Sequence, residues 1–174
     1  RPPNAVARDI VRAANGFVGN RSLSVDGTSY RYDCSGLVEA SLATAGLEEA
    51  GSSAMLFERA RELGVLHHRR LPKPGDIAFF DNTYDRDGNG RNDDSLTHSA
   101  VVVAVDSDGT VDMVHIGSKG VTDLRMNLRN PHDVELNGAR LNDYLRSKTG
   151  RDPATTEYLA GELWTGFGSF WAAQ

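Results

Sequence analysis

The stretch YRYDCSGLVEASLATAG, residues 30–46, decides how this chain of 174 residues is interpreted. Its apolar residues recur at the spacing of a helix, and a glycine stands where such a helix would stop. These residues are Leu37, Val38, Leu42 and Gly46. Asp33 or Ser35 suits the N-terminal cap, because a short polar side chain can accept a hydrogen bond from the first turn. Cys34 is therefore expected at, or just before, the N-terminus of a helix.

Cys34 is the one cysteine in the sequence, which excludes an intramolecular disulfide. The thiolate is the nucleophilic form of cysteine, and both a helix N-terminus and a nearby imidazolium favour that form. His98 is the best candidate for the imidazole, because it opens a β-branched run after a long polar loop. The alternative interpretation is a buried, inert cysteine accompanied by ordinary surface histidines.

Helical patterns come first in the chain and strand patterns follow, which predicts an α+β fold. Helices are expected after Pro2 and Pro3 up to Gly16, from Cys34 to Gly46, and over 53–63. Strands are expected over 77–80, 99–105, 111–116 and 121–128. The segment 16–29 is expected to be a loop rich in Gly, Ser and Asn. The aromatic tail over 158–171 is expected to pack back on the domain.

A second histidine, His115, follows His98 on the next expected strand. A four-residue loop at 106–109 would pair Val105 with Thr110. His115 would then lie diagonal to His98 on one face of the sheet, and diagonal neighbours are about 7–8 Å apart. A two-residue turn would leave the two rings too far apart unless a strand bulged. The sequence therefore permits a histidine pair without requiring one.

Four blocks together resemble the NlpC-type cell-wall peptidases, which are papain-like cysteine peptidases related to the CHAP amidases. The blocks are YDCSGLV (32–38), KPGDIAFF (73–80), THSAVVV (97–103) and MVH (113–115). The resemblance implies one papain-like domain over 1–174, with N-terminal helices packed on a mostly antiparallel sheet. An acidic loop insertion lies at about 81–97.

The same resemblance implies a cysteine peptidase that hydrolyses peptide bonds in peptidoglycan stem peptides. It assigns Cys34 as nucleophile, His98 as general base and acid, and His115 as the residue that orients His98. Backbone amides around Cys34 would form the oxyanion hole. The candidate substrate-binding residues are Asp33, Ser35, Tyr32 and Tyr30. No cofactor is expected for catalysis. The alternatives are an N-acetylmuramoyl-L-alanine amidase or an acyltransferase of the same fold, and a catalytically silent module that binds the wall or calcium.

The net charge and the hydropathy of the chain argue against nucleic acid as a partner and against a membrane span. A net charge of −5 argues against sequence-independent nucleic-acid binding, which needs a basic surface. The longest apolar run, Ala100 to Val105, is far shorter than a membrane span. The chain starts Arg-Pro-Pro, so we expect a mature or trimmed product. We expect a monomeric bacterial protein that is secreted, periplasmic or associated with the cell envelope.

The acidic segment DRDGNGRND, residues 85–93, resembles the first nine positions of an EF-hand calcium loop. The expected calcium ligands are Asp85, Asp87, Asn89, the carbonyl of Arg91, and Asp93. Leu96 stands where an EF-hand has its bidentate glutamate, and Asp94 or Asp81 could replace it. The alternative is a solvated acidic insertion without an ion.

Two further groups of histidines receive no functional role. The run His67-His68-Arg69-Arg70 is expected to be an exposed basic loop, because no carboxylate or further histidine accompanies it in the sequence. His132 has no partner that the sequence identifies, and we expect it to be structural or exposed.

Overall fold

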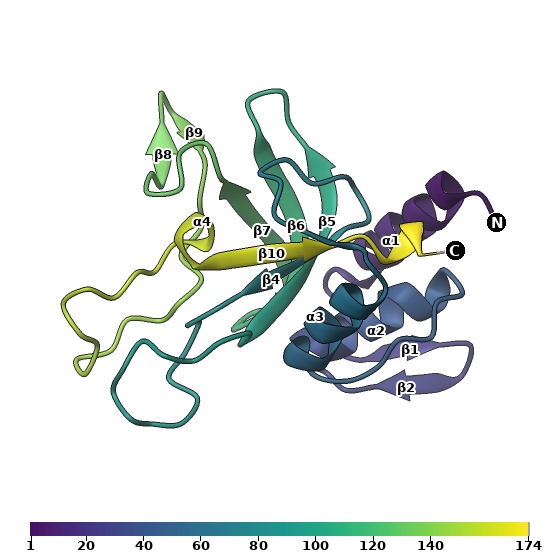
Figure 1. The fold of residues 1–174 in the computed structure, drawn as a ribbon, viewed down its shortest axis with the longest axis horizontal. Helices are drawn as coiled ribbons and strands as arrows, with labels where there is room; N and C mark the ends of the chain where they lie inside the picture. The colour runs from purple at the N-terminus through teal and green to yellow at the C-terminus, as the bar shows by residue number, and fades with distance from the viewer. Residues whose placement is uncertain (174) are drawn as a thin grey trace.

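The computed structural model describes residues 1–173, in which the three N-terminal helices lie at one side of an antiparallel sheet (Figure 1). The α+β prediction, with N-terminal helices on a mostly antiparallel sheet, is confirmed. The helices are α1 (Pro3–Phe17), α2 (Cys34–Thr44), α3 (Ser53–Glu62), α4 (Ala160–Leu163) and the 3₁₀ helix η1 (Phe170–Ala172). The strands are β1 (Leu23–Val25), β2 (Thr28–Tyr30), β3 (Leu66–His67), β4 (Ile77–Phe80), β5 (His98–Val105), β6 (Thr110–Gly117), β7 (Gly120–Asn127), β8 (Glu135–Leu136), β9 (Ala139–Arg140) and β10 (Trp164–Gly168).

The main sheet has the strand order β3-β10-β4-β5-β6-β7, and every neighbouring pair is antiparallel. Both of its faces are covered. Ile77 and Phe79 of β4 pack toward the helices, whereas Ala78 and Phe80 pack toward α4 and the C-terminal segments. This explains why β4 is a continuous apolar run rather than an alternating one.

Helix α2 lies in the middle of the helical layer, against α1, β1, β5 and β6. Residues 35–42 are all buried, so this part of α2 is enclosed on every side. Helix α1 instead buries one stripe, and it runs one residue past the predicted end at Gly16 because Phe17 packs into the core. A central, fully buried helix gives its N-terminus, and hence Cys34, a fixed position.

The predicted loop over 16–29 is partly wrong, because it contains the hairpin β1–β2. Its turn residues Asp26 and Gly27 both have positive φ, at 49° and 83°, which is the conformation that an Asp-Gly hairpin turn requires. Leu23 is buried in the core and anchors the hairpin. The surrounding polar residues conceal this signal in the sequence.

The β5–β6 hairpin differs from the prediction near its turn. Val105 pairs with Val111, not Thr110, because the backbone of Asp106 closes the turn by donating to the carbonyl of Thr110. A bulge at Val103 then absorbs the one-residue shift. Beyond the bulge Val101 pairs with Val114, which is the register that the four-residue loop predicted.

The aromatic tail packs back on the domain, as predicted, and also adds a strand. β10 enters the sheet between β3 and β4, and Phe167 and Phe170 are buried. The prediction of an exposed loop over 67–70 is wrong for His67, which belongs to β3. The ring of His67 lies 3.0 Å from the carboxylate of the fully buried Asp76.

The contacts of the Asp76 carboxylate explain why the turn before β4 ends at an aspartate. Its carboxylate accepts hydrogen bonds from Ser169 Oγ and Trp171 Nε1, both at 2.7 Å, and from the Lys73 amide at 2.9 Å. The turn is thereby tied to the C-terminal tail. A buried carboxylate with this many donors is fully satisfied.

Candidate active site

Cys34 is the first residue of α2, as the sequence predicts, and Asp33 is the N-cap. The carboxylate of Asp33 accepts a hydrogen bond from the Gly36 amide at 2.7 Å and one from Ser35 Oγ at 3.1 Å. The Asp33 side chain therefore binds the amide of Gly36, the third residue of the helix. The amides of Cys34 and Ser35, the first two residues of the helix, lie in the same turn as the thiol.

Gly36 is required by the close approach of the preceding chain. A Cβ atom at this position would lie 1.8 Å from the carbonyl oxygen of Arg31, a backbone atom that cannot move aside. Any larger residue would displace the turn that precedes Cys34. The glycine of the Asp-Cys-Ser-Gly block is therefore explained by sterics alone.

Arg31 holds this turn in place, and sequence reasoning missed it. Its guanidinium donates to Glu39 Oε1 at 2.7 Å and to Ser35 Oγ at 3.1 Å. Glu39 is buried within α2, and its carboxylate also accepts from the Gly51 amide. The pKa of Arg31 is raised, chiefly by the hydrogen bond to Glu39. Nothing local in the sequence signals this contact, since it joins residues eight apart across a loop and a helix.

His98 and His115 form a hydrogen-bonded pair. His98 Nε2 lies 2.9 Å from His115 Nδ1, and the two rings are nearly perpendicular at 88°. The register of β5 and β6 therefore brings together the two histidines that the sequence singled out. Because Nε2 of His98 is engaged, Nδ1 is the nitrogen left to exchange a proton with a nucleophile or substrate.

Burial keeps both imidazoles neutral. It lowers the pKa of His98 to about 3, with a further contribution from His115. The pKa of His115 is lowered to about 4, again by burial, although Asp143 and Asp123 oppose the shift. His98 is therefore unprotonated at neutral pH, which is the state that a general base must have before it takes a proton.

These shifts predict a pH-dependent stability. Between about pH 6.5 and pH 4 the unfolded chain binds more protons at these histidines than the folded chain, so the free energy of unfolding falls as the pH drops. The loss is at most about 1.4 kcal/mol per pH unit for each histidine. Urea denaturation from pH 7 to pH 4.5 measures it. A His98→Asn/His115→Asn double variant should show a shallower slope than the wild type, and an equal slope would contradict the prediction.

Cys34 and His98 line the same cleft, which has a volume of about 590 Å³. A neighbouring groove of about 920 Å³ continues past His98 and His115, and the two share Thr83, His98 and Ile116. Within residues 1–173 Cys34 Sγ makes its hydrogen-bond contact with Ser53 Oγ at 3.7 Å, rather than with His98. Catalytic hydrogen bonds often tighten only when substrate is bound.

Ser53 is a second residue that sequence reasoning missed. It is the first residue of α3, is buried, and bridges the thiol to Ser99 of β5, whose Oγ lies 3.0 Å from Ser53 Oγ. The Ser52-Ser53 pair signals a helix start, and Ser52 is indeed the cap. The contact with Cys34 has no sequence signal.

The four candidate substrate-binding residues separate into two groups. Tyr32, Asp33 and Ser35 line the cleft beside Cys34. The hydroxyl of Tyr32 donates to the Asn20 carbonyl at 2.7 Å, which fixes its ring near the cleft. Tyr30 is half-buried and packs against the core cluster.

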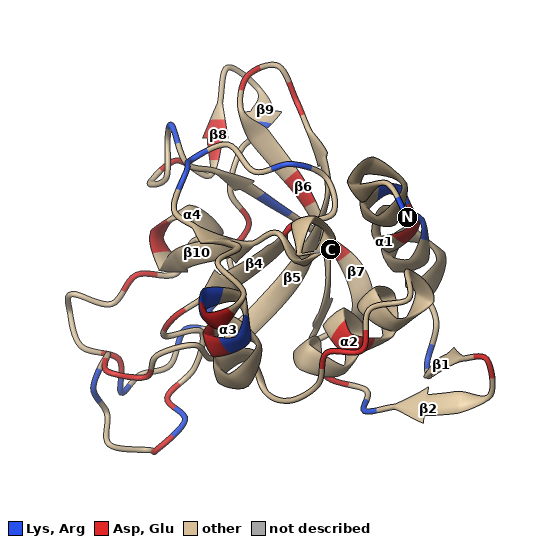
Figure 2. Ribbon diagram, turned by 45° about the vertical axis from the view of Figure 1, so that its right-hand side comes forward, with Lys and Arg blue, Asp and Glu red and all other residues tan. Residues whose placement is uncertain are grey.

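The acidic segment forms the long loop between β4 and β5, where acidic and basic residues alternate (Figure 2). One carboxylate oxygen from each of Asp85, Asp87 and Asp94 lies within 4.8 Å of the others. Asp93 lies outside this group, and its Oδ2 accepts from Asn89 Nδ2 at 2.8 Å. The side-chain oxygen of Asn89 accepts from the Arg91 amide.

His132, which the sequence left without a partner, lies 2.9 Å from Glu162, and its ring is largely exposed. Its pKa is raised, chiefly by that hydrogen bond.

Within residues 1–173 no helix combines the length and the apolar character that crossing a membrane requires.

The comparisons with known proteins are sparse. No family model matches the chain, and no curated protein matches it. Among solved structures, it is similar to a lipoprotein-like protein of the NLP/P60 family from Staphylococcus aureus subsp. aureus Mu50. The identity is 21% and the TM-score 0.44, over 68% of this chain. The chain spans about a third of that protein, 36% of its length. NLP/P60 is the family that the four sequence blocks resemble.

Proposed function

We propose that this chain is a papain-like cysteine peptidase that hydrolyses peptide bonds in peptidoglycan stem peptides. The observation that carries the proposal is the single cleft into which the start of α2 and the start of β5 bring Cys34 and His98, with His115 paired behind His98. The four sequence blocks that resemble the NlpC-type peptidases support the substrate class. The same reasoning makes the protein a secreted or envelope-associated one.

In the proposed mechanism Cys34 Sγ attacks the carbonyl carbon of the scissile bond, and His98 Nδ1 takes the thiol proton. The negative oxygen of the tetrahedral intermediate is stabilised by the first amides of α2, which carry the positive end of the helix dipole. His98 then returns the proton to the leaving amine, which leaves a thioester on Cys34. Water, deprotonated by His98, hydrolyses that thioester and regenerates the thiol.

His115 acts on His98 rather than on substrate. If His98 Nε2–H donates to His115 Nδ1, then His98 Nδ1 is the unprotonated nitrogen that the mechanism needs. The hydrogen bond also fixes the plane of the His98 ring. His115 is therefore a positioning residue in this mechanism.

Digestion of purified muropeptides by the wild type and by Cys34→Ala tests the proposal, with mass spectrometry of the products. The wild type should cut within the stem peptide, and Cys34→Ala should produce no cleavage while keeping its far-UV circular dichroism. Ser24→Ala, an exposed change in the β1–β2 hairpin, is the control and should cleave normally. Release of the whole stem from muramic acid would identify an amidase. Identical products from the wild type and Cys34→Ala would rule out the cysteine mechanism.

A further inference from the structure

The loop between β4 and β5 contains two carboxylate oxygens that are buried and unpaired. Asp94 is 6% exposed, and its Oδ2 has no hydrogen-bond partner among residues 1–173. Asp85 Oδ1 is in the same condition in that part of the chain. Buried polar groups are nearly always satisfied, because leaving a charged oxygen without a partner is costly. Such oxygens are placed to accept a ligand of positive charge.

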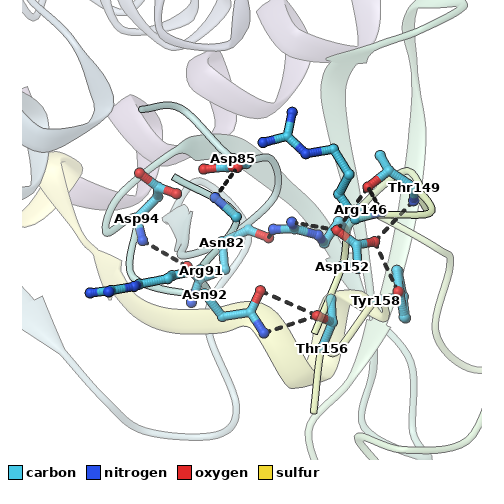
Figure 3. Close-up of polar contacts among 12 residues, drawn as sticks. Asn82, Asp85, Arg91, Asn92, Asp94, Arg146, Thr149, Asp152, Thr156 and Tyr158 are labelled. Atoms are coloured by element: carbon cyan, nitrogen blue, oxygen red, sulfur yellow. Dashed lines mark hydrogen bonds and ion pairs between the residues drawn. The ribbon is translucent and has the colours of Figure 1, made fainter. Parts of the chain in front are cut away.

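These two carboxylates converge with a third. Asp85, Asp87 and Asp94 each place an oxygen within 4.8 Å of the other two, and the carboxyl groups of Asp85 and Asp94 turn toward the same space in Figure 3. Like charges at this separation repel one another, and most strongly where they are buried, as Asp94 is. The loop must therefore be held in this shape against a repulsion that a cation would remove.

No basic side chain among residues 1–173 supplies the positive charge that these three carboxylates lack. None of their ion pairs includes Asp85, Asp87 or Asp94. The nearby arginines are directed elsewhere: Arg86 donates to the Ser95 carbonyl, and Arg146 pairs with Asp152. The surrounding backbone is arranged to present the acidic groups. The Gly90 amide donates to Asp85 Oδ2, and the Asp94 amide to Asn82 Oδ1, both at 2.8 Å.

We propose that Asp85, Asp87 and Asp94 bind one divalent cation of the calcium type. The donors are all hard oxygens from an irregular loop, which suits the large, loosely directed coordination shell of Ca²⁺ better than the rigid octahedron of Mg²⁺. This ligand set revises the one that the sequence pattern predicts. Asp94 takes the place of Asp93, because the carboxylate oxygens that lie within 4.8 Å of one another belong to Asp85, Asp87 and Asp94.

The site has a structural consequence for the cleft. Thr83 and Thr97, at the two ends of the loop, lie 2.6 Å apart through their hydroxyl groups, and both line the cleft next to His98. A cation that closes the loop therefore also fixes this wall. Binding is nevertheless a property of the folded loop and is measured without any substrate.

The test uses the whole chain after chelation, titrated with CaCl₂ and followed by calorimetry and thermal melting. Wild-type protein should release or absorb heat with a stoichiometry near one. Its melting temperature should rise by roughly 5–10 °C when calcium is a hundredfold above Kd. Asp94→Asn should lower the affinity at least about tenfold, which at the same calcium concentration removes about half of the thermal shift or more. Asp93→Asn removes the same charge one residue away and should keep the shift.

A stability measurement in chelator separates a lost ligand from a damaged fold. The Asp94 side chain makes no hydrogen bond among residues 1–173, so Asp94→Asn should melt no lower than the wild type when calcium is absent. Asp26→Asn, in an exposed Asp-Gly turn that accepts asparagine equally well, is the distant control. The proposal is overturned if millimolar calcium gives the wild type neither heat nor thermal shift. It is equally overturned if Asp93→Asn loses as much affinity as Asp94→Asn.

Discussion

Replacing His98 with alanine should lower kcat/KM for stem-peptide cleavage by about 10³–10⁴-fold, with the chain still folded. Among residues 1–173, His98 is the only titratable side chain that lines the Cys34 cleft and also contacts a second imidazole. Without it nothing takes the thiol proton or protonates the leaving amine, and general acid–base catalysis alone contributes about 10²–10⁴-fold. Steady-state rates on purified muropeptides measure the loss.

The two histidines should respond differently to conservative replacement. His115→Asn keeps a polar group that can hydrogen-bond to His98 Nε2, so it should cost about tenfold, whereas His115→Ala should cost more. The ordering expected is therefore His98→Ala, then His115→Ala, then His115→Asn. Equal and small losses in all three variants would remove the histidine pair from the mechanism.

Short-range patterns were sufficient to predict the start of α2. The cap contact joins Asp33 to Gly36, three residues along the chain, so residue types and spacing narrowed the cap to Asp33 or Ser35, and the structure has Asp33. The meeting of His98 and His115 was predictable for a related reason, since one hairpin connects them. Even there, the turn adopted a register one residue away from the prediction, and a bulge at Val103 restored it.

Contacts between distant segments were not predictable. Ser53 meets Ser99 across 46 positions, and Asp76 meets Ser169 across 93. In each case the sequence shows an ordinary polar residue, and only the packing of α3 and the tail on the sheet reveals its partner. The convergence of Asp94 with Asp85 and Asp87 is of the same kind, because the side chain of Asn82, on the far side of the loop, holds the Asp94 amide.

A further contact of this kind joins the acidic loop to the segment over 146–158. Arg146 donates to the Asn82 carbonyl at 2.7 Å and to Asp152 Oδ1 at 2.9 Å, as Figure 3 shows. The side chains of Arg146 and Asp152 are only 3% and 5% exposed. Asp152 also accepts from the Thr149 amide and from Tyr158, and these bonds, led by that of Thr149, hold its pKa far below the usual value. The Arg146–Asp152 ion pair therefore holds the loop between β4 and β5 against the segment over 146–158, beside the groove that His98 lines.

Replacing Arg146 with methionine should destabilise the chain by about 3–5 kcal/mol, because Asp152 then remains buried as an uncompensated charge. The urea midpoint at neutral pH measures this. Arg146→Lys keeps the charge, yet a single ammonium cannot reproduce the fork that reaches both Asn82 and Asp152, so it should recover only part of the loss. The double variant Arg146→Met/Asp152→Asn should be more stable than Arg146→Met alone, since it removes the unpaired carboxylate. A free energy of unfolding for Arg146→Met within about 0.5 kcal/mol of the wild type would show that solvent reaches Asp152 freely, and the loops would then be held by their other contacts.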